Sequence, residues 1–130
     1  MGTRCLTFVY NERNDRLVGI YRQFDGYPGG HGKEIAEFLK DRKIINGIPA
    51  TKKMDKVSNG MDCLAASLIA SLKTDIGNIY IVPTNAGDCG QEYEYHIWEN
   101  RIVVKNFDGN SLFFGDWEKF AEFCDSEEVV

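Results

Sequence analysis

The sequence has no long apolar run, no excess of basic residues and no paired cysteines, and each absence argues against a class of protein. No run of about 18 apolar residues occurs, and the opening MGTRCLTF lacks the apolar stretch of a signal peptide. The 20 Asp and Glu residues outnumber the 15 Lys and Arg residues, which disfavours binding to nucleic acid or to an anionic membrane. We therefore expect a cytoplasmic protein that binds neither membrane nor nucleic acid.

The cysteines are dispersed and never form a C-x-x-C pair, so the sequence contains neither a zinc knuckle nor a redox motif. Asp88, Cys89 and His96 are candidate metal ligands, but no second close pair completes a set of four. We expect reduced thiols, no bound metal and no cofactor. The cysteines are Cys5, Cys63, Cys89 and Cys124.

The first half of the chain predicts a hairpin followed by a helix. RCLTFVY and LVGIYRQF are β-branched and aromatic runs on either side of the polar turn NERNDR. The following segment 25–32, DGYPGGHG, is too rich in glycine for a regular element. Apolar residues at helical spacing predict an amphipathic helix over 33–41, and 42–59 is expected to be a long surface connection.

The second half predicts a buried helix, several strands and a last helix. Ser58 or Asn59 can cap the helix that contains MDCLAASLIASL, and Asp116 can cap the helix 116–124. Four strand-like runs lie between these helices. We expect one α+β domain over residues 1–130, with an N-terminal hairpin and a C-terminal meander in a mostly antiparallel sheet and about three helices packed on it. The four runs are NIYIVP, QEYEYHIW, RIVVKNF and SLFFG.

Two arginines predict an anion site at the end of the hairpin. Matching the apolar faces puts Phe8 opposite Val18, and the same register brings Arg4 opposite Arg22. Like charges directly across a strand pair are unfavourable, so a negative group is expected beside them. A bound anion is one such group, and an ordinary ion pair with Asp25 or Glu34 is the alternative.

The glycine-rich segment lies next to this position and leads into the predicted helix. No Ser, Thr, Asp or Asn precedes that helix, so its first amides are expected to face an approaching anion, although glycine is itself an acceptable cap. The segment matches neither a phosphate-binding P-loop nor a dinucleotide fingerprint. The predicted ligand-binding residues are Arg4, Arg22, Tyr27, Gly30, His31 and Lys33.

Cys63 suggests a different activity, because the first turn of a helix lowers the pKa of a thiol. The order Cys63, His96, then Asn106 or Asp108 is similar to that of papain-like and NlpC/P60-like cysteine hydrolases. Asp62 opposes thiolate formation. His96 also alternates with Glu94 and Trp98, as an ordinary half-buried sheet residue does. The hydrolase is therefore kept as an alternative.

MGTRCLTFVY, YRQFDGYPGGHGKEIAEFLK and NGMDCLAA resemble segments of small phage and viral proteins that often begin with MGTRS, although here Cys5 stands in place of the Ser. The resemblance implies no catalytic residues. It suggests an accessory factor that acts in the cytoplasm of an infected host. We expect non-catalytic binding of a phosphate-bearing small molecule, such as a nucleotide signal, to counter host defence. The alternative is a protein–protein inhibitor of a host defence enzyme that uses the loop 42–59, and a homo-oligomer through the sheet edges stays open.

Overall fold

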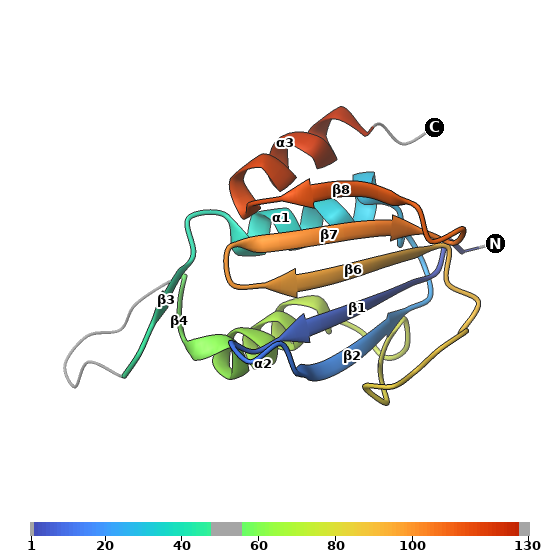
Figure 1. Cartoon of the computed structure of the whole chain (residues 1–130). Coiled ribbons are helices and arrows are strands. Elements are labelled where there is room, and N and C mark those ends of the chain that lie inside the picture. The colour runs from blue at the N-terminus through green and yellow to red at the C-terminus, as the bar shows by residue number, and fades with distance from the viewer. Residues whose placement is uncertain (1, 48–55, 128–130) are drawn as a thin grey trace.

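A six-stranded sheet organises the computed structural model, which describes residues 2–47 and 56–127. The strands are ordered β5-β2-β1-β6-β7-β8, and all neighbours are antiparallel except β1 and β6, which are parallel. The three helices lie on one side of the sheet (Figure 1). The predicted α+β class is confirmed. The elements are β1 (Cys5–Tyr10), β2 (Arg16–Arg22), α1 (Lys33–Leu39), α2 (Gly60–Leu72), β5 (Ile79–Val82), β6 (Tyr93–Trp98), β7 (Arg101–Asn106), β8 (Ser111–Gly115) and α3 (Trp117–Ser126).

The helices pack on the sheet through apolar stripes that the sequence spacing produces. In α2, Leu64, Leu68 and Leu72 follow one another at intervals of one helical turn, and all three are buried. In α3, the predicted cap is confirmed, because the Asp116 carboxylate accepts a hydrogen bond of 2.8 Å from the amide of Lys119. The main core therefore lies between the helices and one face of the sheet.

The central strand β1 is buried along its whole length, because both of its faces are covered. Cys5 and Val9 belong to the main core under the helices. Leu6, Phe8 and Tyr10 point to the opposite side, where they form a second, smaller apolar cluster. None of the three described helices covers that side, which we call the open face (Figure 1). No helix in the described parts of the chain combines the length and apolar character needed to cross a bilayer.

The C-terminal meander is confirmed for β6, β7 and β8 but wrong for β5. The segment Ile79–Val82 pairs with β2 at the far edge of the sheet, and β1 lies between β2 and β6. The turn residues of the sequence do not reveal that β1 lies between β2 and β6, because the parallel pairing of β1 with β6 joins segments far apart in the sequence. The connection 42–59 contains two short parallel strands, β3 (Lys43–Ile45) and β4 (Val57–Asn59), and its residues 48–55 lie outside the described ranges.

The predicted hairpin is confirmed, but its register is shifted by one residue over most of its length. The pair Tyr10–Arg16 fits the predicted register, but an irregularity between Val9 and Tyr10 moves the pairs from Val9–Val18 to Cys5–Arg22 by one position. Arg22 therefore lies opposite Cys5, and not opposite Arg4. A register shift of one residue places a side chain on the other face of the sheet. Arg22 therefore points, like Cys5, to the side that the helices cover.

The outer edge of β5 is partly closed. The Gln23 amide donates to the carbonyl of Asn78, so the backbone of Asn78 faces β2. In an antiparallel ladder successive residues face alternate sides, so the backbone carbonyl of Ile79 faces away from β2. The Lys73 ammonium group occupies this edge and donates to the Ile79 carbonyl oxygen at 3.0 Å. Pro83, which has no amide hydrogen, follows the strand. Lysine and proline at a sheet edge are common obstacles to pairing with another chain.

Candidate functional site

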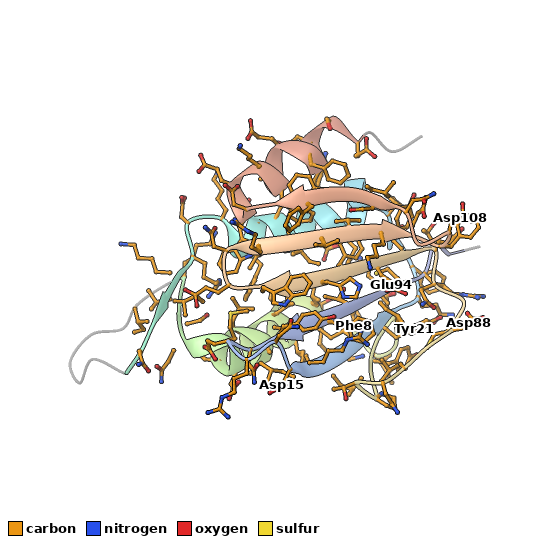
Figure 2. All side chains as sticks on the ribbon, viewed as in Figure 1. Phe8, Asp15, Tyr21, Asp88, Glu94 and Asp108 are labelled. Atoms are coloured by element: carbon orange, nitrogen blue, oxygen red, sulfur yellow. The ribbon has the colours of Figure 1, made fainter. Side chains whose placement is uncertain are left out.

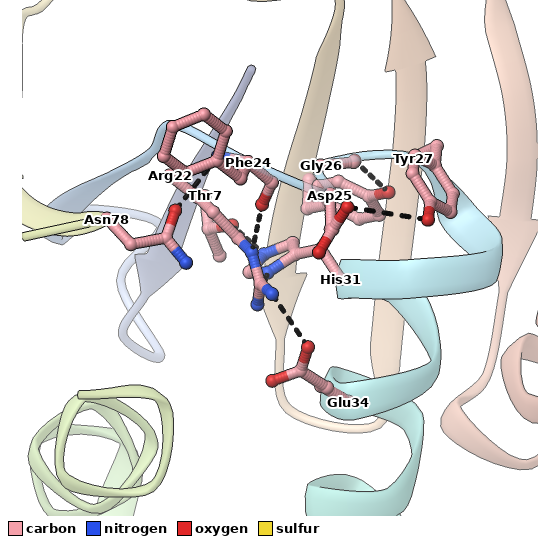
Figure 3. A network of polar contacts seen from close by, with 10 residues as sticks. Thr7, Arg22, Phe24, Asp25, Gly26, Tyr27, His31, Glu34 and Asn78 are labelled. Atoms are coloured by element: carbon pink, nitrogen blue, oxygen red, sulfur yellow. Dashed lines mark hydrogen bonds and ion pairs between the residues drawn. The ribbon is translucent and has the colours of Figure 1, made fainter. Parts of the chain in front are cut away.

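Arg22 is buried and already engaged by the protein itself (Figure 3). It is 6% exposed, and its guanidinium lies 2.8 Å from the carboxylate of Glu34. Its Nε donates to the carbonyl of Phe24 at 2.6 Å. Glu34 thus supplies a negative charge beside Arg22, and this ion pair was the alternative to a bound anion in the sequence analysis.

His31 completes this buried network. Its Nδ1 lies 3.3 Å from an Arg22 guanidinium nitrogen, and its Nε2 lies 2.7 Å from the Thr7 hydroxyl. A guanidinium can only donate, so Nδ1 accepts and Nε2 carries the hydrogen that bonds to Thr7. Complete burial, reinforced by the charge of Arg22, lowers the pKa of His31 to about 3. His31 is therefore a neutral structural group at pH 7.

The segment 25–32 is more regular than predicted. Residues Pro28–Gly32 form a π-helical turn that continues into α1. The His31 amide bonds to the Asp25 carbonyl at 2.8 Å, and the Gly30 amide bonds to the Tyr27 carbonyl at 2.9 Å. A Cβ on Gly30 would lie 2.7 Å from the Asp25 carbonyl oxygen, so glycine is needed for packing. These amides form hydrogen bonds inside the turn. The expectation that they would face an approaching anion is therefore wrong for Gly30 and His31.

The predicted ligand-binding residues differ in their exposure. Arg4 is exposed, and its guanidinium lies beside Gly90, where a Cβ would stand 2.6 Å from its Nη1. Lys33 is exposed on α1, whereas Arg22 and His31 are buried. Binding of a phosphate group at these residues stays a prediction.

The cysteine hydrolase residues are not brought together. Cys63 lies on α2, on the helical side of the sheet. His96 contacts the rings of Phe8 and Tyr10 on the open face. The Asn106 side chain accepts the amide of Asp108 at 3.0 Å and so shapes the turn after β7. Within the described residues, no three acidic, histidine or cysteine side chains are grouped as metal ligands.

A chain of hydrogen bonds crosses the open face. The Tyr10 hydroxyl lies 2.7 Å from His96 Nδ1, and His96 Nε2 lies 3.0 Å from a Glu94 carboxylate oxygen. A carboxylate can only accept, so Nε2 carries the hydrogen and Nδ1 accepts from Tyr10. Arg16 Nε in turn donates to the Tyr10 oxygen at 2.9 Å. We call Arg16, Tyr10, His96 and Glu94 the open-face network.

The network holds a neutral imidazole and an ionised carboxylate at pH 7. Burial lowers the pKa of His96 more than the neighbouring Glu94 raises it. Burial alone would raise the pKa of Glu94, but hydrogen bonds from Gln91 and His96, with the charge of Lys105, keep it below its ordinary value. Glu94 is therefore a fixed negative charge.

A hollow of about 650 Å³ adjoins the network, and Figure 2 shows Phe8 and Glu94 on this side of the sheet. Its wall is formed largely by the connection between β5 and β6 and by Phe107 from the turn after β7. We call it the open-face hollow. It is lined by Phe8, Arg16, Ala86, Gly87, Asp88, Gly90, Gln91, Glu92, Glu94 and Phe107.

The sequence contained only part of the signal for this site. The alternation of Glu94, His96 and Trp98 correctly placed these side chains on one face. The partners on β1 were missed, because Phe8 lies opposite His96 only through the parallel pairing of β1 with β6. Parallel pairs join strands through long crossovers and leave no local turn signal.

Comparisons with protein family models, with curated proteins and with solved structures found no match to this chain. The fold and the site themselves therefore define the class, an α+β domain with helices on one side of its sheet and a polar network beside a hollow on the other.

Proposed function

We propose that this chain is a non-catalytic binding protein that holds a partner protein against its open face. The observation that carries the proposal is the exposure of large apolar side chains there. Phe107 is 74% exposed and lines the hollow, and Phe114 is 70% exposed. Phe114 pairs with Val103, which pairs with His96, so its side chain belongs to the open face. Exposed large apolar side chains on one face of a protein are typical of protein contact sites.

The chemistry of the open-face network supports binding more than catalysis. His96 is 5% exposed, and both of its ring nitrogens are occupied by Tyr10 and Glu94. A general base must reach the proton that it removes, and this imidazole has no free nitrogen to offer. The hollow instead presents a carboxylate and aromatic rings, which are groups that recognise a surface.

The charges of the hollow favour a protein over a phosphate-bearing ligand. The described residues that line the hollow carry the carboxylates of Asp88, Glu92 and Glu94 and the guanidinium of Arg16. A phosphate group in this hollow would meet more negative than positive charge. The resemblance to small phage proteins suggests that the partner is a host protein, and a host defence enzyme is the partner that we propose.

Site-specific photo-crosslinking tests this proposal. A photoreactive phenylalanine analogue is placed at Phe107, and the matched control carries it at Phe24, which is 47% exposed on the connection that follows β2. We expect Phe107 to give one discrete protein adduct in host cells, which Phe114→Ala weakens, and Phe24 to give none. Equal adduct patterns from the two positions, or none from Phe107, would overturn the proposal.

The phosphate-binding alternative has its own test. Thermal unfolding is followed with a panel of nucleotides, cyclic nucleotides and inorganic phosphate, because a ligand at 100 times its dissociation constant adds about 2.7 kcal/mol of stability. Lys33→Ala is the better variant, since Lys33 is exposed whereas Arg22 anchors a buried network. A stabilisation by one compound that Lys33→Ala removes would transfer the binding function to the π-helical turn.

A further inference from the structure

Glu94 is a charged group of the hollow that the protein holds in place. One of its carboxylate oxygens accepts from His96 at 3.0 Å, and the other accepts from Gln91 at 2.9 Å. The side chain is 31% exposed, so the carboxylate is held by the protein on one side and reaches solvent on the other. Each oxygen has further acceptor capacity beyond its single bond, which leaves room for a ligand that donates.

An aromatic ring and further carboxylates surround this anchor. Phe107 forms part of the wall, and Asp88 and Glu92 line the same hollow. The protein itself shows how this face holds a guanidinium, since Arg16 lies 4.0 Å above the ring of Phe8 and donates to Tyr10. A planar cation that stacks on a ring while it donates to an oxygen is the arrangement that arginine favours.

We propose that the open-face hollow receives an arginine side chain of the partner protein, with Glu94 as its anchor. This inference rests on the proposed function and names the chemistry of the contact. The guanidinium donates to Glu94 and stacks on Phe107, while Asp88 and Glu92 contribute attraction at longer range. The formal charge of −5 of the whole chain favours the approach of a basic surface.

Lys105 opposes this contact, as does Arg16 in the lining of the hollow. Lys105 lies directly across from Glu94 on β7, and its charge contributes to the lowered pKa of that carboxyl. Among the described residues, the carboxylate of Glu94 lies close to the neutral imidazole of His96 and forms no ion pair with Lys105. Lys105 therefore competes with an incoming arginine by repulsion, and its removal should strengthen binding.

The probe that tests the inference is N-acetyl-arginine amide, with N-acetyl-citrulline amide as the matched neutral control of nearly equal shape. Amide chemical shifts of the whole chain are followed by NMR during titration. We expect shifts centred on residues 87–94 and a preference for arginine of about fivefold, which corresponds to a partly exposed ion pair of about 1 kcal/mol.

Two variants decide the result. Glu94→Gln keeps the shape of the side chain, and we expect it to bring the arginine preference close to one; Lys105→Met should increase the preference. Equal binding of the two probes by the wild type, or a preference unchanged in both variants, would overturn the inference. Lys105→Met does not touch the hydrogen bonds of the network, so it remains informative if Glu94→Gln is poorly folded.

The proposed function and the arginine anchor can fail separately, because the titration with N-acetyl-arginine amide requires no partner protein. A specific adduct from Phe107 without an arginine preference would leave the binding function standing and remove the arginine anchor. An arginine preference that Glu94→Gln abolishes would support the anchor, whatever the crosslinking at Phe107 yields.

Discussion

Acid should destabilise this protein through His31 before most carboxylates begin to titrate. The imidazole is completely buried, and its pKa is lowered from 6.5 to about 3 in the folded chain. Between these values the unfolded chain binds a proton that the folded chain does not. Stability from this group is therefore fully present above pH 6.5 and is lost as the pH falls toward 3.

The size of the effect follows from this window. Each pH unit in which only the unfolded imidazole is protonated costs about 1.4 kcal/mol of unfolding free energy. Between pH 7.5 and pH 5, the loss from His31 amounts to about 2 kcal/mol. A small domain has only about 5–15 kcal/mol in total, so the change is easy to measure.

Urea unfolding across this pH range checks the prediction, with His31→Gln as the matched variant. A glutamine can accept from Arg22 and donate to Thr7, as the neutral imidazole does. Because His96 is present in both proteins, the difference between their pH profiles isolates His31. We expect the wild type to lose about 2 kcal/mol more than His31→Gln between pH 7.5 and pH 5. Parallel profiles would show that His31 is not held neutral.

The remaining predictions concern the thiols and the sheet edge. Burial raises the pKa of Cys5, and it raises the pKa of Cys124 to about 12, so we expect an alkylating reagent to modify these two thiols only after unfolding, as mass spectrometry can follow. Alkylation of Cys63 should be unchanged by His96→Ala, and a dependence on His96 would revive the hydrolase. Lys73→Ala uncovers the Ile79 carbonyl at the edge of β5, so we expect self-association in sedimentation velocity; a sedimentation coefficient equal to that of wild type at high concentration would refute this.

The local patterns in the sequence predicted the elements well, and the errors arose where distant segments meet. The capped helix after Asp116 and the inward and outward alternation around His96 could be read directly, because both depend on neighbours in the chain. The irregularity between Val9 and Tyr10 could not be predicted from the sequence. It places Arg22 opposite Cys5, where Arg22 is buried and forms an ion pair with Glu34. Sequence pattern gives the period of a strand but not the position of a bulge within it.

The same limit applies to the site on the open face. His96 was placed on the correct face of its strand, but its bond to Tyr10 depends on the parallel neighbour β1. Aromatic residues in the hairpin indicated a strand and nothing about which strand would lie beside it. The open-face network therefore became visible only in three dimensions.

The central position of β1 also has a consequence for how the chain folds during synthesis. Both faces of β1 are buried, but Phe8 meets His96 only after β6 has also been made. Strand β1 must therefore wait, with apolar side chains on both sides, until β2, β5 and β6 have followed it along the chain. Such late closure of distant contacts slows folding and exposes the nascent hairpin to aggregation, so we expect folding of the newly made chain to depend on chaperones that bind extended apolar segments.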